Sequence, residues 1–236
     1  FQDQIEYKKK LFEKVDQIIC ISRNTKKDLQ QEYSIDASKI SVVHLAVNKD
    51  KNVRERSLNI RPFILYVGLR QRYKNFINVI KAYGRSNKLK LNFDFVCFGG
   101  GSFSKIEEEL FKSLSLDRSS IHYFEGDRLD LNYFYQKARI FIFPSLYEGF
   151  GIPLLEAMNM KCPVMCSDTS CFPEIVNDAA ILFDPTDIDS LEFKMEKLIY
   201  DDQLLLNLKK KGNDNLNNYS WKQCADETEK LYKKII

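Results

Sequence analysis

Two glutamates in one short stretch are the residues of this sequence best placed to do chemistry. Glu148 and Glu156 stand eight positions apart in the segment SLYEGFGIPLLEA, residues 145–157. Such carboxylates could form a general acid and base pair, bind a metal, accept hydrogen bonds from ligand hydroxyls, or lie on a solvated helix face. The neighbouring residues indicate which of these roles the two glutamates have.

Pro153 predicts where the helix of this stretch begins. Proline is favourable in a first helical turn, so the helix should start near Ile152. Glu148 then lies in the loop before the helix, and Glu156 lies about one turn inside it. The carboxylates need not face each other, and we expect them to contact different parts of one ligand. From this stretch alone, the alternative that Glu148 only favours the helix N-terminus and Glu156 is solvated stays open.

A basic loop earlier in the chain suits an anionic ligand. Gly68 ends an apolar run, and Arg70, Arg72 and Lys74 follow within six residues. Cationic side chains at a strand-to-helix turn can bind a phosphate or diphosphate together with the N–H groups of the helix start. A solvated basic face is the alternative.

Three successive glycines, Gly99 to Gly101, follow another apolar run in the segment CFGGGSFS. They allow a close approach of the backbone to a ligand or to another element. The pattern is a weak match to a dinucleotide fingerprint, because Ser104 stands where the last glycine is required, although the acidic Glu125 follows the next strand. A dinucleotide oxidoreductase is therefore disfavoured.

The composition excludes some classes of partner. A net charge of +3, from 36 basic and 33 acidic side chains, does not indicate nucleic acid binding. The lysine clusters at 8–10, 209–211 and 233–234 are expected to be solvated helix faces, with a membrane-surface patch as the less favoured alternative. No apolar run of about 18 residues and no signal peptide is present.

The six cysteines indicate a reducing, cytoplasmic setting. Several lie in apolar runs, where cysteine behaves as a small buried hydrophobe. Cys162, Cys166 and Cys171 lack CxxC spacing, and the two histidines, His44 and His122, are far away in sequence. We therefore expect no zinc site and no disulfide framework.

Short apolar runs that alternate with amphipathic segments predict an α/β fold. The expected architecture is a Rossmann-like, doubly wound parallel sheet of about six strands with helices on both faces. Its strands are expected within residues 62–68, 93–101, 121–126, 139–145, 162–167 and 179–185. Ligands of such sheets bind outside the carboxyl ends of the strands, where the three loops described above lie.

The first part of the chain is predicted to form a separate, smaller unit. Residues 17–22 and 41–47 are predicted strands, and residues 23–33 are a predicted helix with Ser22 as N-cap. Residues 49–61 are polar and aperiodic, which predicts a linker. The expected units are 1–48, a short first part; 49–61, the linker; 62–218, the ligand-binding domain; and 219–236, a C-terminal helix.

Taken together, these segments resemble a known family. YVGLRQRYKNF, FVCFGGGSF, the long unit at residues 138–187 and the closing Ser220-Trp221 are similar to the donor-binding half of a GT-B glycosyltransferase. The resemblance is to the retaining glycosyltransferase family 4, including mannosyltransferase-like members, and covers roughly residues 16–236. It implies that residues 1–48 are the tail of an N-terminal, acceptor-side domain, and that the last helix crosses back to that domain.

The resemblance assigns roles to the site residues. Arg70 and Lys74 match the basic pair that holds the donor diphosphate, and Arg72 could substitute for Arg70. Glu148 matches the catalytic-site glutamate at the donor sugar, and Glu156 matches the one that binds the ribose hydroxyls.

Further donor-binding positions are implied in the loops. The main chain of Phe150 and Gly151 matches positions that approach the sugar or phosphate, and Ile152 begins the helix that faces the diphosphate. Gly68 and Gly100 belong to the loops that line the donor. Because fixed cations and helix N–H groups stabilise a leaving diphosphate, no metal or other cofactor is expected.

The implied function is the transfer of a hexose from a nucleoside diphosphate sugar to a glycan or lipid-linked acceptor in polysaccharide biosynthesis. The YKNF form of the basic loop resembles that of bacterial surface-polysaccharide mannosyltransferases, which implies GDP-mannose as the donor, with a UDP-sugar as the alternative. The enzyme is expected in the cytoplasm, with peripheral association at the inner membrane face. Since the family's N-terminal domain, with its histidine near the reaction centre, is represented only by its tail, we expect this fragment alone to be inactive or nearly so. His44 should not be taken for that histidine.

Two alternatives remain. One is a non-catalytic sugar-nucleotide-binding or interaction module of the same fold, against which the intact Lys74, Glu148 and Glu156 argue. The other is a different GT-B enzyme, such as a sugar-nucleotide epimerase, which the spacing of the two glutamates disfavours.

Overall fold

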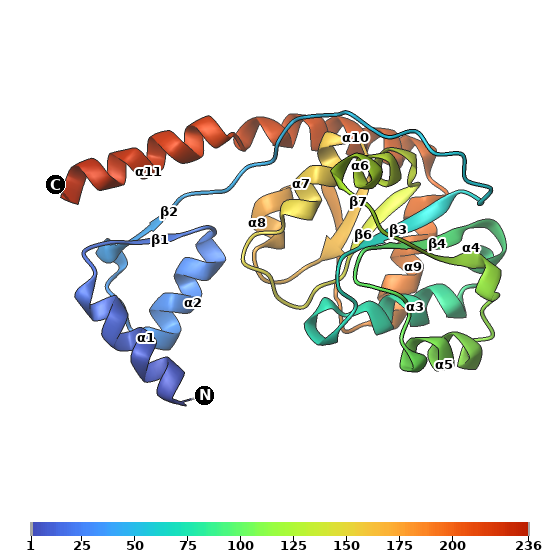
Figure 1. Cartoon of the computed structure of the whole chain (residues 1–236), viewed down its shortest axis with the longest axis horizontal. Coiled ribbons are helices and arrows are strands. Elements are labelled where there is room, and N and C mark those ends of the chain that lie inside the picture. Colours follow the sequence, from blue (N-terminus) through green and yellow to red (C-terminus); the bar gives the residue numbers. More distant parts are fainter. Residues whose placement is uncertain (1, 236) are drawn as a thin grey trace.

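The computed structural model describes residues 2–235 and contains a six-stranded, fully parallel sheet (Figure 1). The strand order is β5-β4-β3-β6-β7-β8, with parallel pairing throughout. The strands are β3 (Phe63–Val67), β4 (Asp94–Phe98), β5 (Ile121–Phe124), β6 (Ile140–Phe143), β7 (Val164–Ser167) and β8 (Ala180–Phe183). All six predicted strands are confirmed, and so is the doubly wound fold class.

Both faces of this sheet are buried, which is why its strands are almost continuously apolar. In β3, Leu65 faces one hydrophobic core, whereas Ile64 and Tyr66 face the other. In β4, Val96 faces the first core and Cys97 the second. Each fully buried large apolar side chain stabilises the fold by about 1.5–3 kcal/mol, so the two cores fix the register of the sheet.

Helices cover each face. The core around Leu65 is closed by α6 (Arg128–Lys137), α7 (Ile152–Asn159) and α8 (Phe172–Val176). The core around Ile64 is closed by α3 (Phe76–Arg85), α5 (Lys105–Ser113) and α9 (Ile188–Ile199). The remaining helices of this domain are the short α4 (Asn87–Asn92) and the longer α10 (Asp202–Asn215), with 3-10 turns at Arg72–Lys74, Arg118–Ser120 and Leu216–Asn218.

A small unit precedes the sheet domain and lies to one side of it (Figure 1). It consists of α1 (Gln2–Lys14), β1 (Ile18–Cys20), α2 (Arg23–Tyr33), a 3-10 turn at Ala37–Lys39 and β2 (Ile40–Val42). β1 and β2 form a separate two-stranded parallel sheet. The predicted helix at residues 23–33 is confirmed with its cap, since the Ser22 side chain accepts a hydrogen bond from the Thr25 N–H.

The predicted strand at residues 41–47 is wrong beyond Val42. Residues 43–47 have no regular structure, although Ala46 and Val47 are buried. These two side chains join the Leu65 core of the large domain, so their apolar character serves packing and not a sheet ladder.

Residues 49–61, the predicted linker, are extended and run along the large domain above α6 (Figure 1). The linker is attached by ion pairs: the carboxylate of Asp130, which is 2% exposed, binds both Arg54 and Arg56. A buried carboxylate is stable only when it is paired, so α6 holds this segment in place. The sequence alone did not indicate this attachment.

The last helix, α11 (Trp221–Ile235), leaves the large domain and reaches the small unit (Figure 1). It lies beside β2, where Arg23, Lys26, Val43 and Leu231 line a shared groove. Trp221 and Tyr232 remain 50% and 59% exposed. Within residues 2–235, no helix is both long enough and apolar enough to cross a lipid bilayer.

Candidate functional site

The strand order places two of the predicted loops side by side. β3 lies between β4 and β6, so the chain turns to opposite sides of the sheet after β3 and after β6. At such a switch point the two following loops separate and leave a crevice at the carboxyl edge, which is where ligands bind in open α/β sheets. The basic loop follows β3 and the Glu148 loop follows β6.

Lys74 and Glu148 join these two loops. The Lys74 Nζ lies 2.5 Å from the Glu148 Oε1, and each side chain is 19% exposed. The Ser145 hydroxyl donates to the same carboxylate oxygen at 2.9 Å, and the Leu146 N–H donates to the Tyr73 carbonyl at 2.7 Å. A cation and a carboxylate are thereby fixed together at the mouth of the crevice, where charge-assisted hydrogen bonds are strong.

Helix α7 begins at Ile152, as the sequence predicts. Gly151 is its N-cap, with a left-handed φ of 96°, and it supplies no side-chain cap. Phe150, immediately before it, is buried. Pro153 has no N–H and the Leu154 N–H donates to the Gly151 carbonyl at 2.9 Å, so the Ile152 N–H and the helix dipole are what suit this end of α7 to an anion.

Glu156 lies inside α7, half-buried, with partners different from those of Glu148. Its nearest hydrogen-bond donor is the Tyr135 hydroxyl at 3.5 Å. Burial raises the pKa of Glu156, whereas the charge of Arg128 and the Tyr135 hydroxyl lower it to a smaller extent. A carboxylate with one long hydrogen bond retains acceptor capacity for the hydroxyls of a ligand.

Arg70 occupies a different environment from that of Lys74. Its guanidinium is buried under the glycine loop and donates to the Glu107 carboxylate at 2.6 Å and to the carbonyls of Gly99, Gly101 and Ser102. These bonds use four of its five N–H groups. Direct contact between Arg70 and a diphosphate stays a prediction, whereas exposed Arg72 is free of such contacts within the described residues.

The glycine loop packs against the basic loop. Gly100 has a φ of 78°, and a Cβ built there would lie 2.5 Å from the Gly68 carbonyl oxygen. The close approach that the sequence predicted is therefore made to Gly68, a second element of the same site. Gly68 and Gly100 thus set the spacing between the loops after β3 and β4.

Sequence reasoning missed the contacts that attach the Glu148 loop to the rest of the protein. Hydroxyl and thiol groups of residues 169–171, in the loop after β7, bind its main chain. The Tyr147 hydroxyl donates to Asp28 of α2 at 2.6 Å. No local pattern could have indicated these contacts, since the partners are 21 or more positions apart.

A further carboxylate, Glu174, connects the two units. It accepts hydrogen bonds from the Arg23 N–H at 2.9 Å and the Asn24 N–H at 3.3 Å, which are the first N–H groups of α2. The His44 Nε2 lies 2.6 Å from the same side chain. A negative charge is favourable at a helix N-terminus, so Glu174 of α8 holds the small unit against the site.

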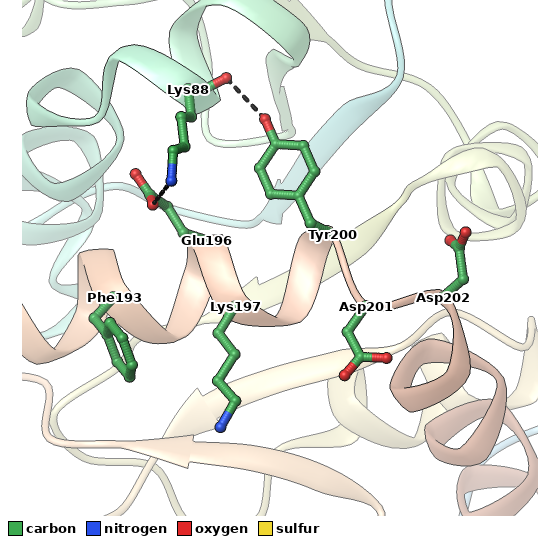
Figure 2. A pocket seen from close by; sticks show the side chains of 7 residues that line it. All are labelled: Lys88, Phe193, Glu196, Lys197, Tyr200, Asp201 and Asp202. Carbon is green, nitrogen blue, oxygen red and sulfur yellow. Dashed lines mark hydrogen bonds and ion pairs between the residues drawn. The ribbon is translucent and has the colours of Figure 1, made fainter.

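A hollow larger than any beside these loops lies elsewhere on the surface that the structure describes. It has a volume of about 880 Å³ and is lined by Lys88, Glu196, Lys197, Tyr200 and neighbouring residues (Figure 2). Its residues bind each other: the Lys88 Nζ lies 3.5 Å from the Glu196 carboxylate, and the Tyr200 hydroxyl donates to the Lys88 main-chain carbonyl at 3.0 Å. Because these residues precede β4 or end α9, the hollow lies at the amino edge of the sheet, away from the switch point. A hollow of about 360 Å³ lies at the carboxyl edge between the loops after β3 and β4, beside Gln71, Arg72, Gly100 and Ser102.

The cysteines form no disulfide among the described residues. All six cysteines are free thiols, and all but Cys224 are buried. Across residues 2–235, no three histidine, cysteine, aspartate or glutamate side chains gather in a way that could hold a metal ion.

The fold is a doubly wound α/β domain whose switch point carries the Lys74–Glu148 pair and the N-terminus of α7. The family profile described as "Glycosyl transferases group 1" matches residues 48–215, and the profile "Glycosyltransferase Family 4" matches residues 3–51. The chain therefore belongs to the group 1 glycosyl transferases, with the GT-B fold.

Two curated relatives are mannosyltransferases by name. The chain is 28% identical over 253 residues to the O-antigen chain mannosyltransferase B of Escherichia coli, covering 98% of this chain and 65% of that protein. It is 28% identical over 184 residues to the O-antigen chain mannosyltransferase RfbU of Salmonella typhimurium, covering 77% and 50%. The chain thus spans one half to about two thirds of these relatives.

Solved structures show the same fold. Sucrose-phosphate synthase from Thermosynechococcus elongatus superposes with a TM-score of 0.85 at 20% identity, covering all of this chain and 62% of that one. A glycosyltransferase from Rickettsia africae superposes with a TM-score of 0.80 at 23% identity, covering 96% and 66%.

Proposed function

We propose that this chain is the donor-binding half of a retaining hexosyltransferase. It binds a nucleoside diphosphate sugar, with GDP-mannose favoured, and the whole enzyme transfers the hexose to a glycan or lipid-linked acceptor in polysaccharide synthesis. The observation that carries the proposal is the Lys74–Glu148 pair beside the uncapped N-terminus of α7 at the switch point of the sheet. Membership of the group 1 glycosyl transferases and relatives with mannosyltransferase names support it.

Lys74 and the N-terminus of α7 would bind the diphosphate. The leaving diphosphate gains negative charge as its bond to the sugar breaks, and fixed N–H groups and an ammonium stabilise that charge in the transition state. Arg72, an exposed residue of the same loop as Lys74, is the second cation for the diphosphate. No metal is required in this scheme.

The two glutamates would hold the two ends of the ligand. Glu156 accepts hydrogen bonds from the ribose hydroxyls, for which its carboxylate has unused acceptor sites. Glu148, fixed by Lys74 and Ser145, lies at the sugar. Each has its own protein partners, so they do not form the paired acid and base of glycoside hydrolases, in which both carboxyls flank one bond.

The acceptor would enter between the two units, where α2 contacts the Glu148 loop through Asp28 and Tyr147. A lipid-linked acceptor would require the enzyme to work at a membrane surface, so we propose peripheral action at the cytoplasmic face. The lysines near both ends of the chain are compatible with anionic lipids.

Ligand-dependent stabilisation tests the proposal. GDP, UDP, ADP and their sugars should be compared by thermal shift, since a ligand at 100 times its dissociation constant adds about 2.7 kcal/mol to the free energy of unfolding. Glu156→Ala should weaken binding of every nucleoside diphosphate, whereas Glu148→Ala should mainly remove the preference for the intact sugar nucleotide. Glu109→Ala, an exposed change on α5, is the matched control. Absence of stabilisation by any of these ligands would refute the donor-binding function.

Transfer itself needs the acceptor side of the enzyme. A radiolabelled sugar nucleotide, offered with the acceptor glycan to an enzyme of the relatives' full length, should give product in the presence of a chelator. Loss of transfer on chelation would contradict the metal-free scheme, and inversion of the anomeric configuration would contradict retention.

A further inference from the structure

The main chain of the Glu148 loop is held by side chains from another loop. Residues 145–151 form neither helix nor strand, so their N–H and C=O groups need partners from elsewhere. Apart from the Tyr73 carbonyl, which accepts from the Leu146 N–H, several of those partners come from the segment Thr169-Ser170-Cys171, between β7 and α8. We name this segment the TSC clamp.

Ser170 makes the central contact of the TSC clamp. Its hydroxyl accepts a hydrogen bond from the Glu148 N–H at 3.1 Å and donates one to the Glu148 carbonyl at 2.7 Å. One hydroxyl thereby binds both polar groups of a single residue, which restricts rotation about the backbone of Glu148. Ser170 itself has a φ of 56°, a left-handed conformation that costs about 1 kcal/mol or more for a residue with a Cβ.

The two neighbours of Ser170 extend the attachment in both directions. The Thr169 hydroxyl donates to the Leu146 carbonyl at 3.0 Å, and the Cys171 thiol lies 3.2 Å from the carbonyls of both Glu148 and Phe150. Burial raises the pKa of Cys171 to about 12, so the thiol keeps its proton and remains a donor. Three consecutive side chains therefore bind every second residue of the Glu148 loop, as a neighbouring strand would.

The carboxylate of Glu148 depends on this backbone restraint. Lys74 and Ser145 fix one carboxylate oxygen, Oε1, but both belong to loops and Lys74 must also meet the diphosphate in the proposed function. When Lys74 turns to the diphosphate, the main chain becomes the chief restraint on where the Glu148 carboxylate points. A side chain displaced by about 1 Å loses much of a hydrogen bond to a sugar hydroxyl, because such bonds weaken steeply with distance and angle.

We propose that Ser170, with the TSC clamp around it, is a positioning residue for Glu148 and sets the preference for sugar nucleotide over free nucleoside diphosphate. This inference rests on the proposed function. It assigns to the loop after β7 a role in recognising the sugar, although the clamp reaches the ligand only through Glu148.

The test compares the dissociation constants of GDP and GDP-mannose, and of UDP and UDP-glucose, by calorimetry on the whole chain. Ser170→Ala removes the hydroxyl. Ser170→Gly also removes it but suits the left-handed backbone, so that this variant folds even if the alanine variant does not. Ser115→Gly is the control, because Ser115 has nearly the same backbone conformation, with a φ of 51°, and lies on an exposed turn after α5.

For whichever sugar nucleotide the wild type prefers, both Ser170 variants should reduce the ratio of the two dissociation constants by about tenfold, equivalent to 1.4 kcal/mol. They should leave the affinity for the free nucleoside diphosphate within about twofold, and Ser115→Gly should change neither value. A merely structural role would lower the melting temperature without changing this ratio. If the wild type binds the sugar nucleotide and the free nucleoside diphosphate with different affinities, and both Ser170 variants keep the same ratio, the positioning role of the TSC clamp is overturned and the proposed function is not. A wild type that binds none of the four ligands overturns the proposed function and the clamp with it.

Discussion

The ammonium of Lys74 and the carboxylate of Glu148 meet at 2.5 Å although the residues are 74 positions apart in the chain. The contact joins the loops after β3 and β6, which become neighbours because β3 and β6 pair in parallel at the switch point. The Glu148 carboxylate therefore contacts the same cation that we assign to the diphosphate. Binding would replace one anion by another at Lys74.

Lys74→Ala is expected to weaken the binding of nucleoside diphosphates by about tenfold to 100-fold, because a hydrogen bond to a charged group contributes about 1.5–3 kcal/mol. Calorimetry with GDP and UDP measures this loss, which should shrink at high salt as the wild-type affinity falls. Lys112→Ala, on the exposed surface of α5, is the control. Equal affinities of the wild type and Lys74→Ala would remove Lys74 from the site.

Glu156→Gln is expected to stabilise the ligand-free protein at neutral pH. Burial raises the pKa of Glu156 in the folded state. Below the pKa of Glu156 in the unfolded state, the carboxyl is protonated in both states and burial of its charge costs nothing. As the pH rises through the higher pKa of the folded state, this advantage is lost, so wild-type Glu156 lowers the free energy of unfolding above that pH. The neutral glutamine avoids this cost, and its gain should vanish toward pH 4.

Urea denaturation of the wild type and Glu156→Gln across this pH range measures the difference. Glu109→Gln, a change on the exposed surface of α5, is the control. The same Glu156→Gln change should weaken nucleoside diphosphate binding, because a carboxylate accepts stronger hydrogen bonds from hydroxyls than an amide does. A gain that persists unchanged at low pH would show that burial of the charge is not its cause.

Gly100→Ala should destabilise the protein by at least about 1 kcal/mol more than Gly101→Ala. The two glycines have nearly equal φ values, 78° and 80°, so the backbone strain of an alanine is similar at both. Only at position 100 would the new Cβ meet another atom closely, the Gly68 carbonyl oxygen at 2.5 Å, whereas position 101 has open space around it. Urea denaturation midpoints give the comparison. Equal losses of stability in the two variants would mean that the Gly68 and Gly100 loops can move apart to accommodate a Cβ.

Asp130→Ala should release the linker from α6. The change leaves Arg54 and Arg56 without their shared carboxylate, and we expect a loss of about 1–3 kcal/mol, limited because both arginines can reach solvent. Proteolysis within residues 49–61 should become faster. Glu55→Ala, which removes an exposed carboxylate of the linker itself, should leave the cleavage rate near that of the wild type. Unchanged cleavage in Asp130→Ala would show that other contacts hold the linker.

The sequence by itself determined the class of fold and the local geometry of the elements. Residues 63–67 and 140–143 are apolar at every position, which is typical of strands buried on both faces. Ser22 and Pro153 set the starts of α2 and α7, because a side-chain cap and a fixed φ act within a few residues of the helix end. These are short-range effects, so a linear pattern carries them.

Only the tertiary structure decided which partners the predicted site residues have. Arg70 and Lys74 are both cations of one loop, yet Arg70 lies buried against Glu107 and the glycine loop while Lys74 faces the crevice beside Glu148. The attachment of the Glu148 loop by the TSC clamp and of the small unit by Glu174 likewise depends on contacts across 22 and 151 positions. Such partners are brought together by strand order and by the packing of helices on both faces of the sheet, and no spacing along the chain encodes them.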